Sequence, residues 1–220
     1  MKPQNKKLNR RQQIRRTMFL FFLLLLMAGV YVMHRYYQEE KCQEEQFHKL
    51  EEWENNPIPP LAPENVNNPD WMGWLKIKGS SISYPIMQKE GDGEYYLHRD
   101  VDGNYSFYGT PFLDERCTPD SDNCIIYGHN IKGRKMFGAL HAYESEEYYK
   151  KHQEVFFRVG EEKRKYRVVS VIHADISFPV YSFADVGNWE EYREYVGMIL
   201  SNSLYHTEWG EQIKKKRKEE

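Results

Sequence analysis

The chain has 220 residues, of which 40% are hydrophobic and 15% aromatic, and its formal net charge is −2 at pH 7. This length accommodates one domain of ordinary size with appendages, and the aromatic share is typical of a β-rich body. Residues 1–16 hold seven Lys or Arg and no acid, so removing them from the net charge of −2 leaves −9 for the remainder. An acidic body argues against nucleic acid as a partner.

The basic N-terminus precedes an uncharged apolar run from Met18 to Met33. It predicts a transmembrane anchor over residues 17–34. As a helix the run spans roughly 24 Å, which is short of a hydrocarbon core of about 30 Å, and snorkelling by flanking arginines absorbs the difference. A cleaved signal peptide is the alternative. With an uncleaved anchor, the positive-inside rule keeps residues 1–16 as a cytoplasmic tail and places the body outside the membrane.

Residues 35–67 are predicted to connect this anchor to the body. Their first part is mostly charged, with Phe47, Leu50 and Trp53 at the three-residue spacing of an amphipathic stalk helix. Four prolines follow within residues 56–65, and they favour an extended spacer over regular structure. The spacer marks the boundary of a domain expected at residues 68–207.

The domain consists of short apolar runs broken by Gly, Asp and Asn, which are typical of strands. A strand pair is predicted at W-L-K-I-K and S-I-S-Y-P-I-M, within residues 74–87, where Pro85 favours an edge or a bulge. Further strands are predicted at residues 109–114, 124–128, 155–159 and 166–176.

Two helices are predicted from their capping residues. Ser145 precedes two acidic residues and then Lys150, Lys151 and His152, in agreement with the helix dipole, and Asn188 begins a second helix that runs to about residue 202. Many strands with few helices favour a mainly β fold, a β-barrel rather than a parallel α/β sheet.

Three cysteines make an odd count for a chain predicted to face an oxidising exterior. At least one is therefore unpaired or pairs with another chain. Cys117 and Cys124 flank a turn-rich segment and can either close a small loop or remain two ordinary thiols at strand ends. Cys42 lies in the stalk, where an exposed thiol is expected.

A long series of segments within residues 68–205 resembles the class B sortases, membrane-anchored cysteine transpeptidases of Gram-positive bacteria. The segments are N-P-D-W-M-G-W-L-K-I at 68–77, Y-P-I-M-Q at 84–88, Y-Y-L-H at 95–98, G-T-P-F-L-D at 109–114, I-I-Y-G-H-N at 125–130, M-F-G-A-L at 136–140 and S-L-Y at 203–205. The resemblance implies an eight-stranded barrel, of which about six strands are encoded here, and it implies no cofactor.

The resemblance also implies a division of catalytic work. A cysteine thiolate attacks the Thr carbonyl of a sorting motif, an imidazole serves the leaving amine, and an arginine stabilises the developing oxyanion. His129 is the residue carried over as the imidazole. The family's T-L-S-T-C strand and its arginine strand have no counterpart, because from Glu208 the chain reads E-W-G-E-Q-I-K-K-K-R-K-E-E. We therefore expect a domain truncated before its nucleophile, followed by a charged tail at 208–220.

Other residues are poor replacements for this chemistry. Cys124 lies five residues before His129 on one predicted strand, about 16 Å away at roughly 3.3 Å per residue. A hydroxyl of Ser201 or Ser203 is a possible but unfavoured nucleophile. The other histidines considered lack the spacing of a zinc site, so no metal site is predicted. The basic C-terminal end, Lys214–Lys218, is expected to be solvated and disordered. Those histidines are His98, His141, His152, His173 and His206.

Two functional hypotheses follow. The first is a class B sortase homologue at the cell membrane, of the type that joins secreted proteins to the cell wall, inactive as given because its nucleophile Cys and its Arg are missing. Its partners are a sorting-signal peptide and, as amine acceptor, a cell-wall peptide precursor. The alternative is a non-catalytic, membrane-anchored binding protein or one half of a split sortase.

Overall fold

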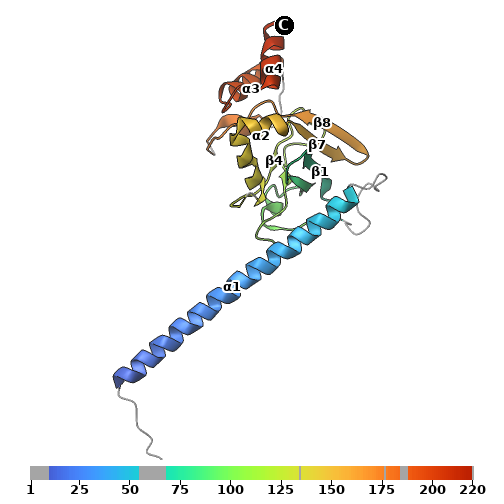
Figure 1. Cartoon of the computed structure of the whole chain (residues 1–220). Helices are drawn as coiled ribbons and strands as arrows, with labels where there is room; N and C mark the ends of the chain where they lie inside the picture. Colours follow the sequence, from blue (N-terminus) through green and yellow to red (C-terminus); the bar gives the residue numbers. More distant parts are fainter. Residues whose placement is uncertain (1–9, 55–67, 134, 176, 184–187, 220) are drawn as a thin grey trace, which may run out of the picture. The chain divides into compact units, whose positions relative to one another are not determined.

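The structure, a computed structural model, describes residues 10–54, 68–133, 135–175, 177–183 and 188–219 (Figure 1). The chain divides into two units, Met1–Glu44 and Glu45–Glu220. The first unit holds most of helix α1 (Arg10–Glu54), whose apolar residues from Met18 to Met33 are largely exposed. By length and composition α1 can cross a membrane, a test that a signal sequence also passes. The predicted anchor and stalk thus belong to one helix, and the predicted proline-rich spacer lies almost entirely outside the described residues.

The second unit is built on a six-stranded sheet of order β4-β3-β2-β1-β7-β8. Its pairs are antiparallel except for β2 and β3, which are parallel, and a separate hairpin joins β5 to β6. The strands are β1 (Trp71–Ile77), β2 (Ser83–Met87), β3 (Phe112–Leu113), β4 (Ile126–Tyr127), β5 (Asn130–Ile131), β6 (Lys135–Met136), β7 (Glu154–Val159) and β8 (Glu162–Arg167). The mainly β body that the sequence predicted is confirmed.

Short helices accompany the strands: η1 (Tyr95–His98), η2 (Phe137–Glu144), α2 (Glu146–Lys151), η3 (Pro179–Ser182), α3 (Trp189–Ser201) and α4 (Glu208–Glu219). Both predicted caps are confirmed. The Ser145 side chain accepts a hydrogen bond from the Tyr148 amide, and the Asn188 side chain accepts from the amides of Glu190 and Glu191.

The side chains of Trp74, Ile86 and Met87 are buried where β1 pairs with β2. The Trp74 indole also donates to the Ser83 hydroxyl at 3.1 Å, so its polar atom is satisfied. At Gly73 an added Cβ would lie 2.1 Å from the Arg158 carbonyl oxygen on β7. Only glycine allows the two strands this approach, which coincides with a register shift in β1.

Three predictions about secondary structure were wrong. The strand expected at residues 166–176 is β8 at Glu162–Arg167, and the apolar residues after it bond elsewhere: the Leu204 amide donates to the Val171 carbonyl at 2.8 Å. For Pro85 the edge alternative is wrong, because β2 lies between β1 and β3, whereas the bulge alternative agrees with a register shift in β1 opposite Ile86 and Met87. The β3 side of β2 is paired at Met87 alone, so that ladder requires no N–H at Pro85.

The third wrong prediction concerns the C-terminal tail, which forms α4 instead of a disordered end. Thr207 caps this helix, since its hydroxyl accepts from the Gly210 amide at 2.9 Å. Trp209 attaches the helix to the body, donating from its indole to the Gln153 side chain at 2.9 Å and stacking under the Arg167 guanidinium. These contacts join parts of the chain far apart in sequence, which a charge pattern does not reveal.

Candidate active site

A cavity of about 510 Å³ opens beside the ends of β3 and β4, and His129 is in its wall. The other lining residues come from four stretches: Gly93, Glu94 and Leu97; Phe112; Asp114, Glu115 and Arg116; and Tyr127, Gly128 and Asn130. The cavity therefore gathers the Y-Y-L-H, F-L-D and Y-G-H-N segments of the sequence. It combines an imidazole, a guanidinium and several carboxylates within one concave surface.

His129 lies in the short connection between β4 and β5 and is half-buried. Its Nε2 atom is 2.7 Å from the Leu97 carbonyl oxygen. Because a carbonyl can only accept, Nε2 carries the hydrogen, and Nδ1 is the ring nitrogen that can take up a proton. The His98 ring lies against this imidazole, with ring centres 5.2 Å apart. The ring orientation and tautomer of His129 are thus set by η1.

The Leu97 carbonyl is held in turn by a close backbone approach. Gly109 has φ +59°, and an added Cβ there would lie 2.2 Å from the Leu97 oxygen. Both the left-handed conformation and the lack of space require glycine. On the other side, the Phe137 amide donates to the His129 carbonyl at 2.9 Å, which fixes the backbone of the histidine itself.

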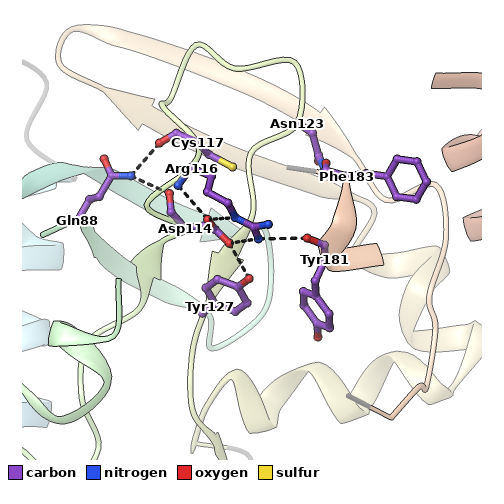
Figure 2. A network of polar contacts seen from close by, with 8 residues as sticks. All are labelled: Gln88, Asp114, Arg116, Cys117, Asn123, Tyr127, Tyr181 and Phe183. Atoms are coloured by element: carbon purple, nitrogen blue, oxygen red, sulfur yellow. Dashed lines mark hydrogen bonds and ion pairs between the residues drawn. The ribbon is translucent and has the colours of Figure 1, made fainter. Parts of the chain in front are cut away.

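Asp114, at the end of β3, organises the polar wall of the cavity (Figure 2). Its carboxylate accepts from Arg116 Nε at 2.9 Å and Nη2 at 2.7 Å, and from the Tyr127 hydroxyl at 2.8 Å. The Arg116 hydrogen bonds hold the pKa of Asp114 well below its usual range, while burial raises the pKa of Tyr127 to about 12. The carboxylate is therefore ionised and the phenol protonated across the physiological pH range.

None of the three cysteines is among the described residues that line this cavity. Cys117 is buried, and it packs with Ile86, Leu113 and Phe157 in a cluster that Cys124 also touches. Burial raises the pKa of the Cys124 thiol to about 11, so little thiolate exists near neutrality. Cys42 is exposed on α1. All three cysteines lie in the described residues, and none of them forms a disulfide there.

A second, more apolar cavity of about 650 Å³ adjoins the first. We call it the apolar groove. Its walls are β4, η2 and the extended segment after β8, and Tyr127 lines both cavities. His141, Glu144 and His173 lie at its rim, with His141 Nδ1 2.9 Å from Glu144 Oε1. Among the described residues no group of His, Cys, Asp and Glu has the arrangement of a metal site.

Sequence reasoning singled out His129 but missed the residues around Asp114. The D-E-R spacing directly after a predicted strand was a usable signal, because an acid and an arginine two positions apart readily pair. The contacts of this pair with Tyr127 and Tyr181 span 13 and 65 residues, and nothing in the sequence indicated them.

Comparison with known proteins gives a consistent result. No family model matches the chain. It is 29% identical over 140 residues to Sortase B of Listeria monocytogenes, and the match covers 63% of this chain and 56% of the relative. It is 27% identical over 143 residues to Sortase B of Staphylococcus aureus, and that match covers 64% of this chain and 58% of the relative. The chain thus spans less than two thirds of the length of these curated relatives.

Solved structures extend the likeness to three dimensions. A Bacillus anthracis protein described as similar to sortase B matches with a TM-score of 0.65 and 27% identity, covering 79% of this chain and 84% of that one. Sortase B from Listeria monocytogenes matches with a TM-score of 0.60 and 28% identity, covering 66% and 82%. A sortase B complexed with triglycine matches with a TM-score of 0.66 and 25% identity, covering 78% and 82%. The predicted fold, an incomplete barrel of curled sheet with short helices, is confirmed.

Proposed function

Because this chain is a class B sortase homologue, we propose that its body acts in sortase transpeptidation, which cleaves the C-terminal sorting signal of a secreted protein and joins the protein to a cell-wall amine. The observation that carries the proposal is the cavity that places His129 beside Asp114, Arg116 and Tyr127. A glycine-based amine is a reasonable acceptor, since a sortase B relative has been solved with triglycine.

In this proposal His129 is the proton-transfer residue. Its Nε2–H is engaged by the Leu97 carbonyl, so Nδ1 is the atom that gives a proton to a leaving amine and takes one from an attacking amine. A peptide bound in the cavity meets hydrogen-bond acceptors from Glu94 and Glu115 and a fixed positive charge at Arg116. These groups can bind and orient a peptide without any further chemistry.

Cleavage also needs a thiolate within reach of the scissile carbonyl. Cys117 is buried and Cys124 has a raised pKa, and neither lines the cavity. We therefore expect these 220 residues by themselves to bind a sorting signal and not to cleave it.

The test is to incubate the full chain, in detergent or nanodiscs, with a fluorescent peptide carrying an N-P-x-T-type signal, with and without triglycine. Fluorescence anisotropy measures binding and chromatography measures cleavage. Binding without cleavage is the expected result. Cleavage would contradict the inactivity, and the absence of binding would remove the proposal as a whole. If wild type does cleave, a His129→Gln variant tests the role of the imidazole, because it should then bind the peptide and fail to cleave it.

A second candidate function is one half of a split sortase. The specific observation is that, within the part of the chain that the structure describes, β4 is the end strand of the sheet and its residues line the apolar groove. An unpaired strand edge beside an apolar cavity readily accepts another strand. A peptide with the T-L-S-T-C strand and an arginine strand, added in trans, is then expected to restore cleavage. If that peptide binds but no cleavage follows, the non-catalytic binding role is favoured.

We further propose the predicted division of the chain: basic tail 1–16, anchor 17–34, stalk and linker 35–67, domain 68–207 and charged tail 208–220. The N-terminus is then cytoplasmic and the body extracytoplasmic, at the membrane of a Gram-positive cell. The exposed apolar residues of α1 support an anchor. Protease added to intact protoplasts should degrade the body and spare a tag at the N-terminus. Degradation of the tag with survival of the body would overturn this orientation.

A further inference from the structure

The helix η3 belongs to the long connection between β8 and α3, and it is fastened to the β3–β4 side of the sheet by side chains (Figure 2). Arg116 Nη2 donates to the Tyr181 carbonyl at 3.1 Å. The Asn123 side-chain amide donates to the Phe183 carbonyl. The rings of Tyr127 and Tyr181 stack with centres 6.0 Å apart and planes 26° apart. Three separate contacts therefore converge on η3 and the residue that ends it.

A single carboxylate organises two of these contacts. Asp114, whose side chain is 7% exposed, orients the Arg116 guanidinium through two parallel hydrogen bonds. The same carboxylate accepts from the Tyr127 hydroxyl, whose ring stacks on Tyr181. Both groups that touch Tyr181 thus take their orientation from Asp114. The planar fork of arginine is required for this, because lysine offers a point charge without a second, fixed donor direction.

The position of this network matters because it separates two cavities. Asp114 and Arg116 line the cavity of His129, Tyr181 lines the apolar groove, and Tyr127 lines both. Gly128 and Asn130 also line both cavities, so the backbone after β4 forms one part of the wall between them, and the contacts from Asp114 through Arg116 to Tyr181 form another. If η3 moved away from β4, the two cavities would merge beside Tyr127.

We propose that Arg116 is a positioning residue that tethers η3 to the β3–β4 end of the sheet and so gives the cavity beside His129 one defined wall. Arg116 acts through the Tyr181 backbone and the Tyr127–Tyr181 stack. The tether is a property of the body alone. Its effect on peptide affinity rests on the proposed function, so the two are tested separately.

The tether is tested by hydrogen exchange in the full chain, comparing wild type with Arg116→Lys and Arg116→Gln. The amides of residues 180–183 are expected to exchange faster in both variants, by about tenfold, the ratio that corresponds to loss of one hydrogen bond to a charged donor. Arg164→Lys is the matched control. Arg164 also pairs with two carboxylates, Asp120 and Glu162, and it lines neither cavity. Unchanged exchange at 180–183 in folded Arg116 variants would overturn the proposal.

Peptide binding to the same preparations tests the consequence for the cavity. Arg116→Lys is expected to weaken binding by about three- to tenfold through faster dissociation, with a melting temperature close to that of wild type, since Arg116 is half exposed. Tyr181→Phe keeps the backbone carbonyl and the ring, so it should bind like wild type. A merely structural role would lower the melting temperature and leave the affinity of the folded fraction unchanged, which contradicts the positioning role. If wild type itself does not bind the peptide, the proposed function fails. Hydrogen exchange at residues 180–183 then tests the Arg116 tether by itself.

Discussion

The centre of the sheet and its β4 side are held together by different forces. β1 pairs with β2 from Trp71 to Lys76 and with β7 from Trp74 to Ile77, and the buried side chains of these strands are mainly apolar. By contrast, β2 and β3 pair at one position and β3 and β4 at two. A side-chain network adds to these pairs: the Tyr127 hydroxyl on β4 donates to Asp114 at the end of β3, and Asp114 also pairs with Arg116. Apolar burial is spread over many atoms and does not depend on pH. A polar network depends on a few side chains and on their ionisation.

The largest effect is expected from shortening a central side chain. Ile86 is fully buried, so Ile86→Ala should destabilise the body by about 3 kcal/mol through lost burial and a cavity. Ile126→Ala on β4 is the matched control. Ile126 is only half-buried, and its loss should cost about 1 kcal/mol. Chemical denaturation measures both. Equal losses at the two positions would contradict the contrast between centre and edge.

The next effect is expected at the polar network and depends on pH. Asp114→Asn should cost about 2 kcal/mol at pH 7, because the guanidinium loses its ionised partner. Since Arg116 lowers the folded pKa of Asp114 below its unfolded value of about 3.9, the stabilisation is complete above that pH and is lost as the pH falls through the folded pKa. The difference between wild type and variant should therefore narrow below about pH 4.

Urea unfolding at pH 7, 5 and 3 measures this narrowing. Asp120→Asn is the control, because Asp120 also pairs with an arginine but its side chain is 80% exposed, and its loss should cost less than about 0.5 kcal/mol. A pH-independent cost for Asp114→Asn would mean that its charge is not what stabilises the β4 side.

The smallest effect on stability is expected at Cys124. Cys124→Ala should cost less than about 1 kcal/mol, since the thiol is small and only half-buried in its cluster. In wild type at pH 8, a pKa of about 11 leaves roughly one thiol in a thousand ionised, so alkylation should be slow, whereas exposed Cys42 should react first. Mass spectrometry of timed iodoacetamide labelling distinguishes the two. Rapid labelling of Cys124 would contradict the raised pKa and make this thiol a candidate nucleophile.

Local signals in the sequence predicted most of the central fold. The strand pair around Trp74 and Ile86 follows from alternation and turn residues, and the helices after Ser145 and Asn188 follow from their caps, because each of these causes acts within a few residues. The prediction of a strand through the residues after Arg167 was wrong for the opposite reason, because the contacts that decide their structure are distant in sequence. Its β-branched residues suit a strand, but Val169 and Val171 bond to Thr207 and Leu204, which only the tertiary fold brings near.

The candidate site likewise contains some residues that the sequence could predict and others that it could not. His129 could be predicted from a family-like segment, and its role as a catalytic residue stays a prediction. The wall made by Arg116 and Tyr181 could not be predicted, since the Arg116–Tyr181 contact crosses 65 residues and uses a backbone carbonyl that carries no sequence signal. A pattern of residue types reveals which groups are available for chemistry, but not which main-chain atoms orient them.

Gly109 touches no ligand in any of these proposals, yet it determines where the Leu97 carbonyl lies and hence which nitrogen of His129 holds a hydrogen. If cleavage were restored by a strand added in trans, a mutational scan read by activity alone would give this glycine the same score as a catalytic residue. Gly109→Ala would displace the Leu97 oxygen and so remove the contact that fixes the His129 tautomer, while every side chain of the cavity kept its identity. Loss of activity on substitution of Gly109 would therefore reflect a change in the hydrogen bonding of the His129 ring, although Gly109 itself does not touch the substrate.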